Sequence, residues 1–154
     1  MRVIAGAARG VQLVVPRDRA TRPIADRVKE TLFAIVGERV VDARAIDLYA
    51  GSGAIGIEAL SRVAAHVTFV ERGRVPLDAI RQNLERTRLA ADASVQAREV
   101  LPFLAGPAGE RFDLAFLDPP YAERAILAPL ERLVSAQRVR PLSRMRLRKR
   151  AARR

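Results

Sequence analysis

Short apolar segments and amphipathic stretches alternate along most of this chain. Four segments are typical of buried strands: 45–48, 67–70, 94–97 and 112–117. Four others place apolar side chains at helical spacing: 26–36, 54–60, 76–89 and 125–134. Because strands that alternate with helices form parallel sheets, the pattern predicts an α/β domain with a parallel central sheet covered on both faces.

The helix expected at 26–36 has a polar start and an apolar stripe. Asp26 is the expected N-cap, and Gly37 is expected to end the helix. The stripe is expected to pack on the core and consists of Val28, Leu32, Ile35 and Val36. The helix at 76–89 is expected to begin at Pro76 and to bury Leu77, Ile80 and Leu84.

Residues 2–15 hold two apolar runs separated by a segment that contains two glycines, which predicts a small β-hairpin. Because two strands alone are marginally stable, the hairpin is expected to lean on the main domain. Arg2 and Arg9 on it are candidates for contacts with phosphates, and simple solvated charge is the alternative. Arg22, Asp26 and Arg27 form a second polar cluster that could face a ligand, and a capped helix is the alternative.

Composition narrows the class of protein. A length of 154 residues suits one domain, and the absence of cysteine excludes disulfides and thiolate chemistry. With one histidine and no ligand cluster, no protein-bound metal is expected. The sequence has no apolar run of membrane-spanning length and no secretory leader, so a cytoplasmic protein is expected. His66, at the start of the strand that holds 67–70, is expected to be structural.

The net charge of +11 is concentrated in the last part of the chain. Residues 132–154 hold ten Lys or Arg side chains and no acid, while the remaining 131 residues carry 18 basic and 17 acidic side chains. An argument for nucleic-acid binding from the net charge therefore depends mostly on this tail.

Residues 46–60 predict a buried strand, a glycine turn and the first turns of a helix. Gly51, Gly53 and Gly56 form a G-x-G-x-x-G pattern, and Ser52 lies within the turn. Glu71 lies 20 residues beyond Gly51, at the end of the next strand, where it could accept hydrogen bonds from ribose hydroxyls. These features alone favour a dinucleotide-binding unit. Gly56 is expected to let the helix pack tightly on its strand.

Asp47, four residues before the first glycine, changes this interpretation. A carboxylate beside the ligand would repel a pyrophosphate and attract an ammonium group. S-adenosylmethionine has no phosphate and carries both an amino group and a sulfonium, so the pattern favours this cofactor. The alternative is that Asp47 only caps the turn and that the glycines only shape a loop.

A second motif, Asp118-Pro119-Pro120-Tyr121, follows the strand at 112–117. Two successive prolines fix the backbone and remove two amide donors, so a carboxylate and a carbonyl are presented in a rigid turn. An exocyclic amine of a nucleobase needs such acceptors for its N–H groups before it can act as a nucleophile. Asp118 and the Pro119 carbonyl could supply them, and Tyr121 could stack on the base. The alternative is a structural turn with a capping acid.

Together these motifs resemble the bacterial small-subunit ribosomal RNA guanine-N2 methyltransferase (RsmD) family. The matching segments are 2–6 with Arg9, Gly10 and Leu13, then 21–23, 26–33, 47–54, 58–62, 67–71 and 118–121. The Asp-Pro-Pro-Tyr motif occurs in many amino-methylating enzymes. The N-terminal hairpin joined to Thr-Arg-Pro-x-x-Asp-Arg-Val is much more specific to this family.

The resemblance implies a Rossmann-like, S-adenosylmethionine-dependent methyltransferase fold that acts on 16S ribosomal RNA in a small-subunit assembly particle. It implies that Asp47, Gly51, Ser52, Gly53, Glu71 and Glu99 contact the cofactor, and that Asp118, Pro119 and Tyr121 contact the target amine. Arg2, Arg9, Arg22, Asp26 and Arg27 are the expected substrate contacts. The expected organisation is a hairpin extension at 1–20, a methyltransferase domain at 21–135 and a disordered basic tail at 136–154, in a monomer.

Two departures from the family pattern stand out. The family usually has Gly-Asp-Ala near the adenine, and this chain has Arg98, Glu99 and Val100 there. The family's sheet also continues beyond Asp-Pro-Pro-Tyr with strands that close it, whereas residues 135–154 contain no apolar strand run. We therefore expect the closing strands to be missing, through truncation or a change of reading frame after about residue 134. In the alternative, the tail is a basic arm with non-specific phosphate affinity.

Three other functions remain open. Without closing strands the chain could be an RNA-binding or cofactor-binding remnant that has lost catalysis. A DNA adenine-N6 methyltransferase would share both main motifs, although no region for target recognition is present. A nicotinamide oxidoreductase is disfavoured by Asp47 and by the proline turn.

Overall fold

The computed structural model describes residues 1–16, 24–107, 109–119, 126–136 and 138–140. Its centre is a sheet of four parallel strands in the order β3-β2-β1-β4. The strands are β1 (Arg44–Leu48), β2 (His66–Glu71), β3 (Ala93–Ala97) and β4 (Leu114–Leu117). The parallel α/β sheet predicted from the apolar pattern is confirmed.

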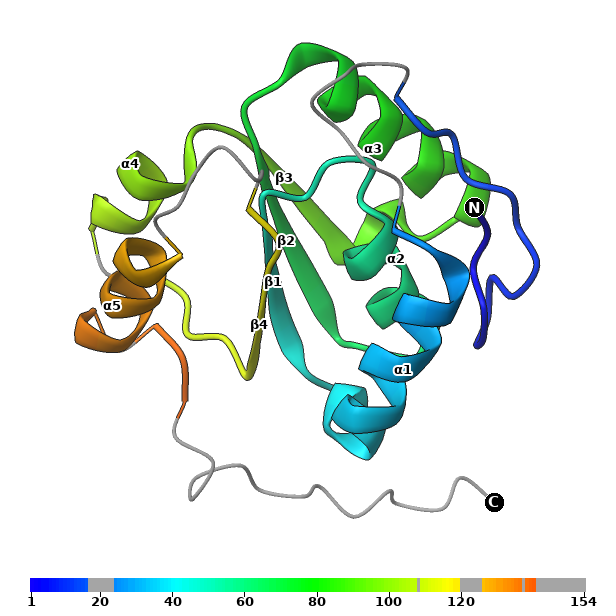
Figure 1. The fold of residues 1–154 in the computed structure, drawn as a ribbon, viewed down its shortest axis with the longest axis horizontal. Helices are drawn as coiled ribbons and strands as arrows, with labels where there is room; N and C mark the ends of the chain where they lie inside the picture. Colours follow the sequence, from blue (N-terminus) through cyan, green and yellow to red (C-terminus); the bar gives the residue numbers. More distant parts are fainter. Residues whose placement is uncertain (17–23, 108, 120–125, 137, 141–154) are drawn as a thin grey trace.

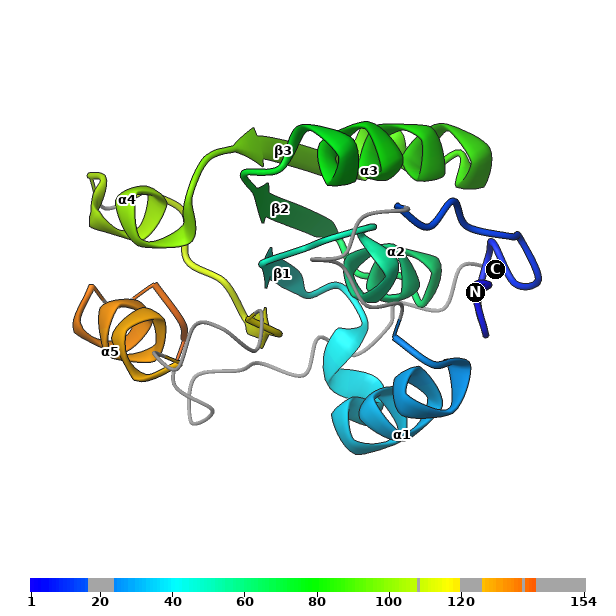
Figure 2. The same ribbon diagram turned by 45° about the horizontal axis from the view of Figure 1, so that its top comes forward.

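Helices cover both faces of this sheet, as Figures 1 and 2 show. The helices α1 (Asp26–Val36), α2 (Ala54–Ser61) and α3 (Arg74–Thr87) lie on one face. The opposite face carries α4 (Val100–Ala105) and α5 (Leu127–Ser135). Two short 3₁₀ turns complete the described elements, η1 (Gly37–Val40) and η2 (Ala90–Asp92).

Each face of the sheet has its own apolar core, because successive side chains of a strand point to opposite faces. Ala45, Val67 and Phe69 belong to the cluster under α1, α2 and α3, whereas Ile46, Leu48 and Val70 belong to the cluster under α4 and α5. Helix α2 is buried along its whole length. Gly56 makes this possible, because a Cβ there would lie 2.3 Å from a Phe69 ring carbon, so the tight packing expected at this glycine is confirmed.

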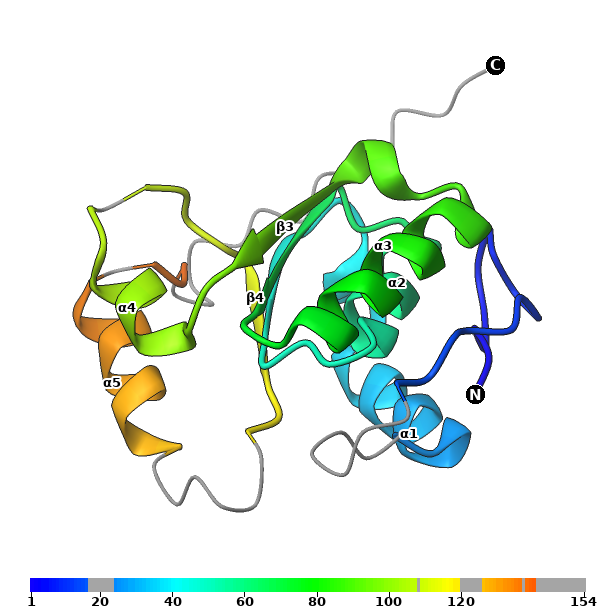
Figure 3. The same cartoon turned by 90° about the horizontal axis from the view of Figure 1, so that it is seen from above.

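The N-terminal segment forms the expected hairpin and leans on the main domain. An antiparallel bridge joins Arg2 to Gln12, and the Val3 amide donates to the Val11 carbonyl at 3.0 Å. The segment runs along the outer side of α2 and α3 (Figure 3). Its contact with α2 is tight at Ser61, whose carbonyl accepts a hydrogen bond from the Ala7 amide at 2.8 Å.

Two glycines of this hairpin allow a controlled test of its docking. Gly6 and Gly10 both have left-handed backbone angles, with φ of 86° and 85°. A Cβ on Gly6 would lie 1.7 Å from the Ser61 carbonyl oxygen, whereas a Cβ on Gly10 would have no neighbour within 4 Å. Gly10→Ala is therefore expected to cost about 1 kcal/mol from backbone strain alone, and Gly6→Ala about 1–2 kcal/mol more. Urea unfolding measures both values, and equal losses would contradict the close approach at Ser61.

Helix α1 differs from its prediction in two respects. Its N-cap is Ala25, which makes no side-chain cap, and Asp26 is the first helical residue, so the prediction of Asp26 as N-cap is wrong. Lys29 and Phe33 are the buried residues of α1, while Val28 and Ile35 are 53% and 70% exposed. The predicted stripe is thus wrong at two of its positions, although Leu32 and Val36 do pack on the core and Gly37 does end the helix.

The later elements follow the prediction more closely. Helix α3 begins two residues before Pro76 and buries Leu77, Ile80 and Leu84 as expected. His66 has the structural role expected of it, because its Nε2 lies 2.9 Å from the Ser94 hydroxyl of the neighbouring strand.

The chain remains packed beyond the expected end of the folded domain at residue 135. Val139 forms an isolated parallel bridge with Phe112, next to β4, and the buried Arg138 donates hydrogen bonds to the carbonyls of Gly106 and Pro107 at 2.9 Å. Arg140 pairs with Asp113 at 3.0 Å. Residues 138–140 therefore pair with the segment that precedes β4 through a single bridge, where the sequence predicts a disordered tail. The rest of that tail, 141–154, lies outside the described residues.

Candidate active site

The glycine turn after β1 has the strand, turn and helix arrangement expected from the sequence. Tyr49, Gly51 and Gly53 have φ angles of 60°, 57° and 77°, which turn the chain sharply between β1 and α2. The Gly53 amide donates to the Ala50 carbonyl at 2.8 Å, and Gly53 is also the N-cap residue of α2. The turn therefore places the N-terminus of α2 at the carboxyl end of β1.

Asp47 lies beneath this turn, with 2% of its surface exposed. Its Oδ2 accepts a hydrogen bond from the Gly56 amide at 2.9 Å, in the first turn of α2. This contact is the capping role that the sequence left open as the alternative, and the predicted contact with a ligand stays a prediction. The pKa of Asp47 is raised to about 8, chiefly because the group is buried; the Gly56 hydrogen bond opposes this shift, and the nearby charges of Asp118 and Glu71 contribute to it.

The strand register brings Asp118 and Glu71 to the same edge of the sheet, the one formed by the carboxyl ends of the strands. Leu48 pairs with Val70 on one side and with Leu117 on the other, so Glu71 and Asp118 come level with one another just past the paired residues. From strand spacing and rise, the Cα atoms of Asp47 and Asp118 are about 8 Å apart. The two acids singled out in the sequence therefore converge at one edge.

This edge also contains the point where the strand order reverses. From β1 the chain continues to β2 and β3 on one side, and it then returns to β4 on the other. Ligands of open α/β sheets bind outside the carboxyl ends of the strands at such a switch point. The two strands that flank the switch point are β1 and β4. Asp47 lies in β1, and Asp118 directly follows β4.

Glu71 holds the ends of β1 and β2 together. Its Oε2 accepts a hydrogen bond from the Gly51 amide at 2.9 Å, and its Oε1 accepts from the amides of Arg72 and Gly73 at 2.8 Å and 2.7 Å. The side chain is half-buried. Because each carboxylate oxygen has two lone pairs, Glu71 can brace the glycine turn and still accept a hydroxyl donor.

The remaining cofactor candidates occupy different environments. Glu99 is 61% exposed and forms an ion pair of 3.4 Å with Arg72, so it lies beside the residue after Glu71. Ser52 is buried, and its carbonyl accepts a hydrogen bond of 3.0 Å from the Asn83 side chain. Of the second motif, Asp118 is exposed and Pro119 is half-buried. The predicted roles of Tyr121 and Arg22 concern positions outside the described residues.

The predicted substrate contacts at the N-terminus lie elsewhere. Arg2 forms an ion pair of 3.4 Å with Asp26, while Arg9 and Arg27 are exposed. The Arg2 and Asp26 pair meets the C-terminal half of α2, through Lys29 and Glu58, whereas the glycine turn is at the N-terminus of that helix. Arg2 and Asp26 are therefore linked to the middle of α2 and not to the glycine turn.

A buried ionic cluster was not found by sequence reasoning. Lys29 and Glu58 are fully buried, their Nζ and Oε2 lie 3.6 Å apart, and Arg62 Nε lies 2.8 Å from Glu58 Oε1. Lys29 also donates to the Arg2 carbonyl. Burial lowers the pKa of Lys29, while the charges of Glu58 and Asp26 oppose that shift. The available signal was Glu58 itself, the one charged residue of the largely apolar sequence of α2.

The donor set of the edge fits a cationic cofactor. The charges of Asp118 and Glu71 both raise the pKa of Asp47, so the three acids lie close together, and a pyrophosphate would meet the carboxylates of Glu71 and Asp118. An ammonium and a sulfonium would instead relieve their repulsion. Among the described residues, no group of three or more His, Asp or Glu side chains is arranged to hold a metal ion. In the same part of the chain, no helix is long and apolar enough to cross a membrane.

Comparisons with known proteins agree with this geometry. The family described as "Conserved hypothetical protein 95" matches residues 1–150. "Ribosomal RNA small subunit methyltransferase D" of Haemophilus influenzae is 40% identical over 132 residues, which are 82% of this chain and 68% of that protein. The Escherichia coli K12 protein of the same name is 42% identical over 121 residues, which are 79% of this chain and 60% of that protein.

A solved structure shares the fold. A hypothetical protein of Thermus thermophilus superposes with a TM-score of 0.79 at 35% identity, covering 91% of this chain and 80% of that one. The chain thus spans between three fifths and four fifths of the length of these three proteins.

Proposed function

The chain belongs to the ribosomal RNA small subunit methyltransferase D family, and from this premise we propose that it is an S-adenosylmethionine-dependent methyltransferase of ribosomal RNA. The proposed target is the 2-amino group of a guanine in 16S ribosomal RNA within a small-subunit assembly particle. The observation that carries the proposal is the convergence of Asp47, Glu71 and Asp118 at the switch point of the sheet.

Each residue in and around the glycine turn would contact a different part of the cofactor. Asp47 lies under the turn, where the positive charge of a bound ammonium group would lower its raised pKa and favour the carboxylate that balances the methionine end. Gly51 has no side chain to keep a ligand from the backbone, and Gly53 would approach the methionine part through its backbone. Glu71 would accept a ribose hydroxyl while bracing Gly51. Ser52 and Glu99 complete the proposed set, with Glu99 at the adenine end, beside Arg72.

Asp118 would prepare the amine for transfer. When bound, S-adenosylmethionine supplies a methyl group on a positively charged sulfur, which makes it a reactive donor. Asp118 and the Pro119 carbonyl would accept the two N–H groups of the target amine, which orients the nitrogen and makes it a better nucleophile. As the amine gains its methyl group, Asp118 would accept one N–H proton, and because its side chain is exposed it could release that proton to water. A base within a duplex would first have to be flipped out.

Substitution of Asp118 tests this role. Purified protein is incubated with labelled S-adenosylmethionine and unmodified small-subunit particles, and label in the RNA is measured. Asp118→Ala is expected to lower the initial rate about 100-fold, because the amine loses its acceptor. Because Asp118 is exposed, the variant should keep the wild-type urea unfolding midpoint.

The matched control is Asp92→Asn. Asp92 is also an exposed acid, but it directly precedes β3. It therefore lies at the amino ends of the parallel strands, whereas Asp118 lies at their carboxyl ends. Its rate should stay within twofold of wild type. Folded wild-type protein that binds S-adenosylhomocysteine without labelling RNA would instead support the cofactor-binding remnant, and transfer unaffected by Asp118→Ala would refute the assigned role.

A further inference from the structure

Asn83 is a fully buried polar side chain on the apolar face of α3. It lies three residues after Ile80 and next to Leu84, so helical spacing directs it toward the core, where an amide is costly unless it is hydrogen-bonded. Its amide makes three hydrogen bonds to main-chain groups of two separate segments. The Oδ1 accepts from the Val14 amide at 2.6 Å, and the Nδ2 donates to the Val14 and Ser52 carbonyls at 2.9 Å and 3.0 Å.

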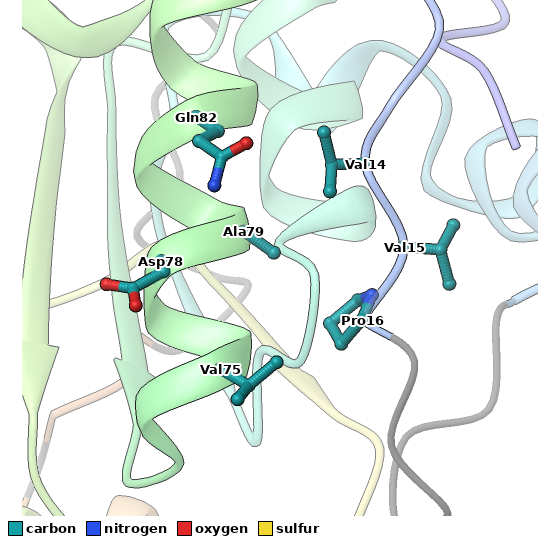
Figure 4. A pocket seen from close by; sticks show the side chains of 7 residues that line it. All are labelled: Val14, Val15, Pro16, Val75, Asp78, Ala79 and Gln82. Carbon is teal, nitrogen blue, oxygen red and sulfur yellow. The ribbon is translucent and has the colours of Figure 1, made fainter.

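These bonds join two segments that are far apart in the sequence. Ser52 lies in the glycine turn between β1 and α2, and Val14 lies near the end of the N-terminal segment. Figure 4 shows Val14, Val15 and Pro16 running alongside α3, opposite Val75 and Ala79. Asn83 pairs with both main-chain groups of Val14, much as a neighbouring strand would, and it fixes the Ser52 carbonyl with its remaining N–H.

We infer that Asn83 is a positioning residue that couples the cofactor-binding turn to the N-terminal segment. The inference rests on the proposed function, because it assigns the glycine turn to S-adenosylmethionine. A carboxamide is suited to this place because it accepts one hydrogen bond and donates two while remaining neutral. Movement of either segment must break bonds to Asn83, so order in one segment stabilises the other.

The isosteric variant Asn83→Asp tests the coupling. It keeps an acceptor for the Val14 amide, but a carboxylate oxygen then replaces the nitrogen that donates to the Val14 and Ser52 carbonyls, so both of those bonds are lost and the oxygens repel one another. Affinity for S-adenosylhomocysteine, measured by titration calorimetry, is expected to fall at least tenfold. Circular dichroism at the temperature of the titration shows whether the variant is folded.

Thr87→Val is the matched control. Thr87 is also buried on α3, one turn beyond Asn83, but its hydroxyl donates, within the described residues, only to the Asn83 and Leu84 carbonyls of the same helix. The substitution therefore removes buried hydrogen bonds without touching the glycine turn or the N-terminal segment. It is expected to lower stability and to leave the affinity for S-adenosylhomocysteine within twofold of wild type, so a loss of affinity in Asn83→Asp alone separates positioning from general stability.

Each outcome has a distinct meaning. Wild type that binds S-adenosylhomocysteine together with folded Asn83→Asp that binds it equally well overturns the coupling and leaves the proposed function standing. Wild type that does not bind it overturns both. If Asn83→Asp does not fold, hydrogen exchange of the wild type decides: S-adenosylhomocysteine is expected to slow exchange of the Val14 amide at least fivefold, and unchanged exchange there overturns the inference.

Discussion

Replacing Glu58 with alanine is expected to lower the free energy of unfolding by about 4 kcal/mol, because removing one partner of a buried ion pair leaves the other charge uncompensated. In the described part of the chain, the acidic partner that Lys29 would keep is Asp26, at 3.9 Å. The amides of Ile4 and Ala5, which donate to Glu58 at 2.8 Å and 3.1 Å, would also lose their acceptor. The N-terminal hairpin should therefore detach along with the loss of stability.

The pair itself is expected to contribute less than its disruption costs. Burial already lowers the pKa of Lys29, so the fold bears a desolvation cost that Glu58 and Asp26 offset only in part. Combining Lys29→Met with Glu58→Gln removes both charges and keeps an acceptor oxygen for one of the two hairpin amides. The double variant should be less destabilised than the sum of the two single variants, which urea unfolding at pH 7 measures.

An exposed pair provides the control for this prediction. Asp78 and Arg81 of α3 lie 3.3 Å apart and are both more than half exposed. Asp78→Asn should change stability by less than about 0.5 kcal/mol, since exposed pairs are weak. A loss below about 1 kcal/mol for Glu58→Ala would contradict the buried cluster.

The sequence predicted the frame of the site well because strong local signals set it. The spacing of Gly51, Gly53 and Gly56 encodes a sharp turn and a close helix contact, and both are present. Apolar strands separated by helices imply parallel order, so residues that follow the strands must share an edge. This rule alone was enough to place Glu71 and Asp118 together.

Contacts between segments that are distant in the sequence could not be predicted from the local pattern of apolar residues. The stripe assigned to α1 included Val28 and Ile35, which are exposed, because apolar spacing does not show that the hairpin would bring a buried acceptor to Lys29. Asp26 is a residue type that is common at N-caps, yet its carboxylate forms an ion pair with Arg2. In each case a partner from a distant segment decided which face of the helix is buried.

The end of the described chain shows the same limit. Arg138 and Arg140 flank Val139 in a segment too basic to suggest a strand. Nonetheless the Phe112 amide donates to the Arg138 carbonyl at 2.6 Å, and the Arg140 amide donates to the Phe112 carbonyl at 2.9 Å. These are main-chain bonds to the open edge of the sheet, and such bonds do not depend on apolar side chains.

Asp47→Asn is expected to be more stable relative to wild type as the pH rises. The folded state holds the Asp47 proton up to a pKa of about 8, whereas the unfolded chain releases it near the ordinary value of 3.8. Between these values the folded state binds more protons, so this group makes stability fall as the pH rises through the window and recover as the pH falls. The penalty is on the order of 4 kcal/mol at pH 7.

Asparagine removes that penalty and keeps an acceptor for the Gly56 amide. The difference in unfolding free energy between variant and wild type should therefore shift by on the order of 3 kcal/mol toward the variant from pH 5 to pH 8. Under the proposed function the same change removes the partner of the ligand's ammonium group. Affinity for S-adenosylhomocysteine should then fall about tenfold or more while stability rises.

Urea unfolding at pH 5, 6.5 and 8 measures the first effect, and titration calorimetry measures the second. Asp92→Asn is again the control, because an exposed carboxylate should leave the pH profile parallel to that of wild type. Parallel profiles for Asp47→Asn would show that Asp47 titrates normally and that its burial carries no charge penalty. If the wild-type profile is steeper but ligand affinity is unchanged, Asp47 is a buried acid that caps α2 and does not contact the cofactor.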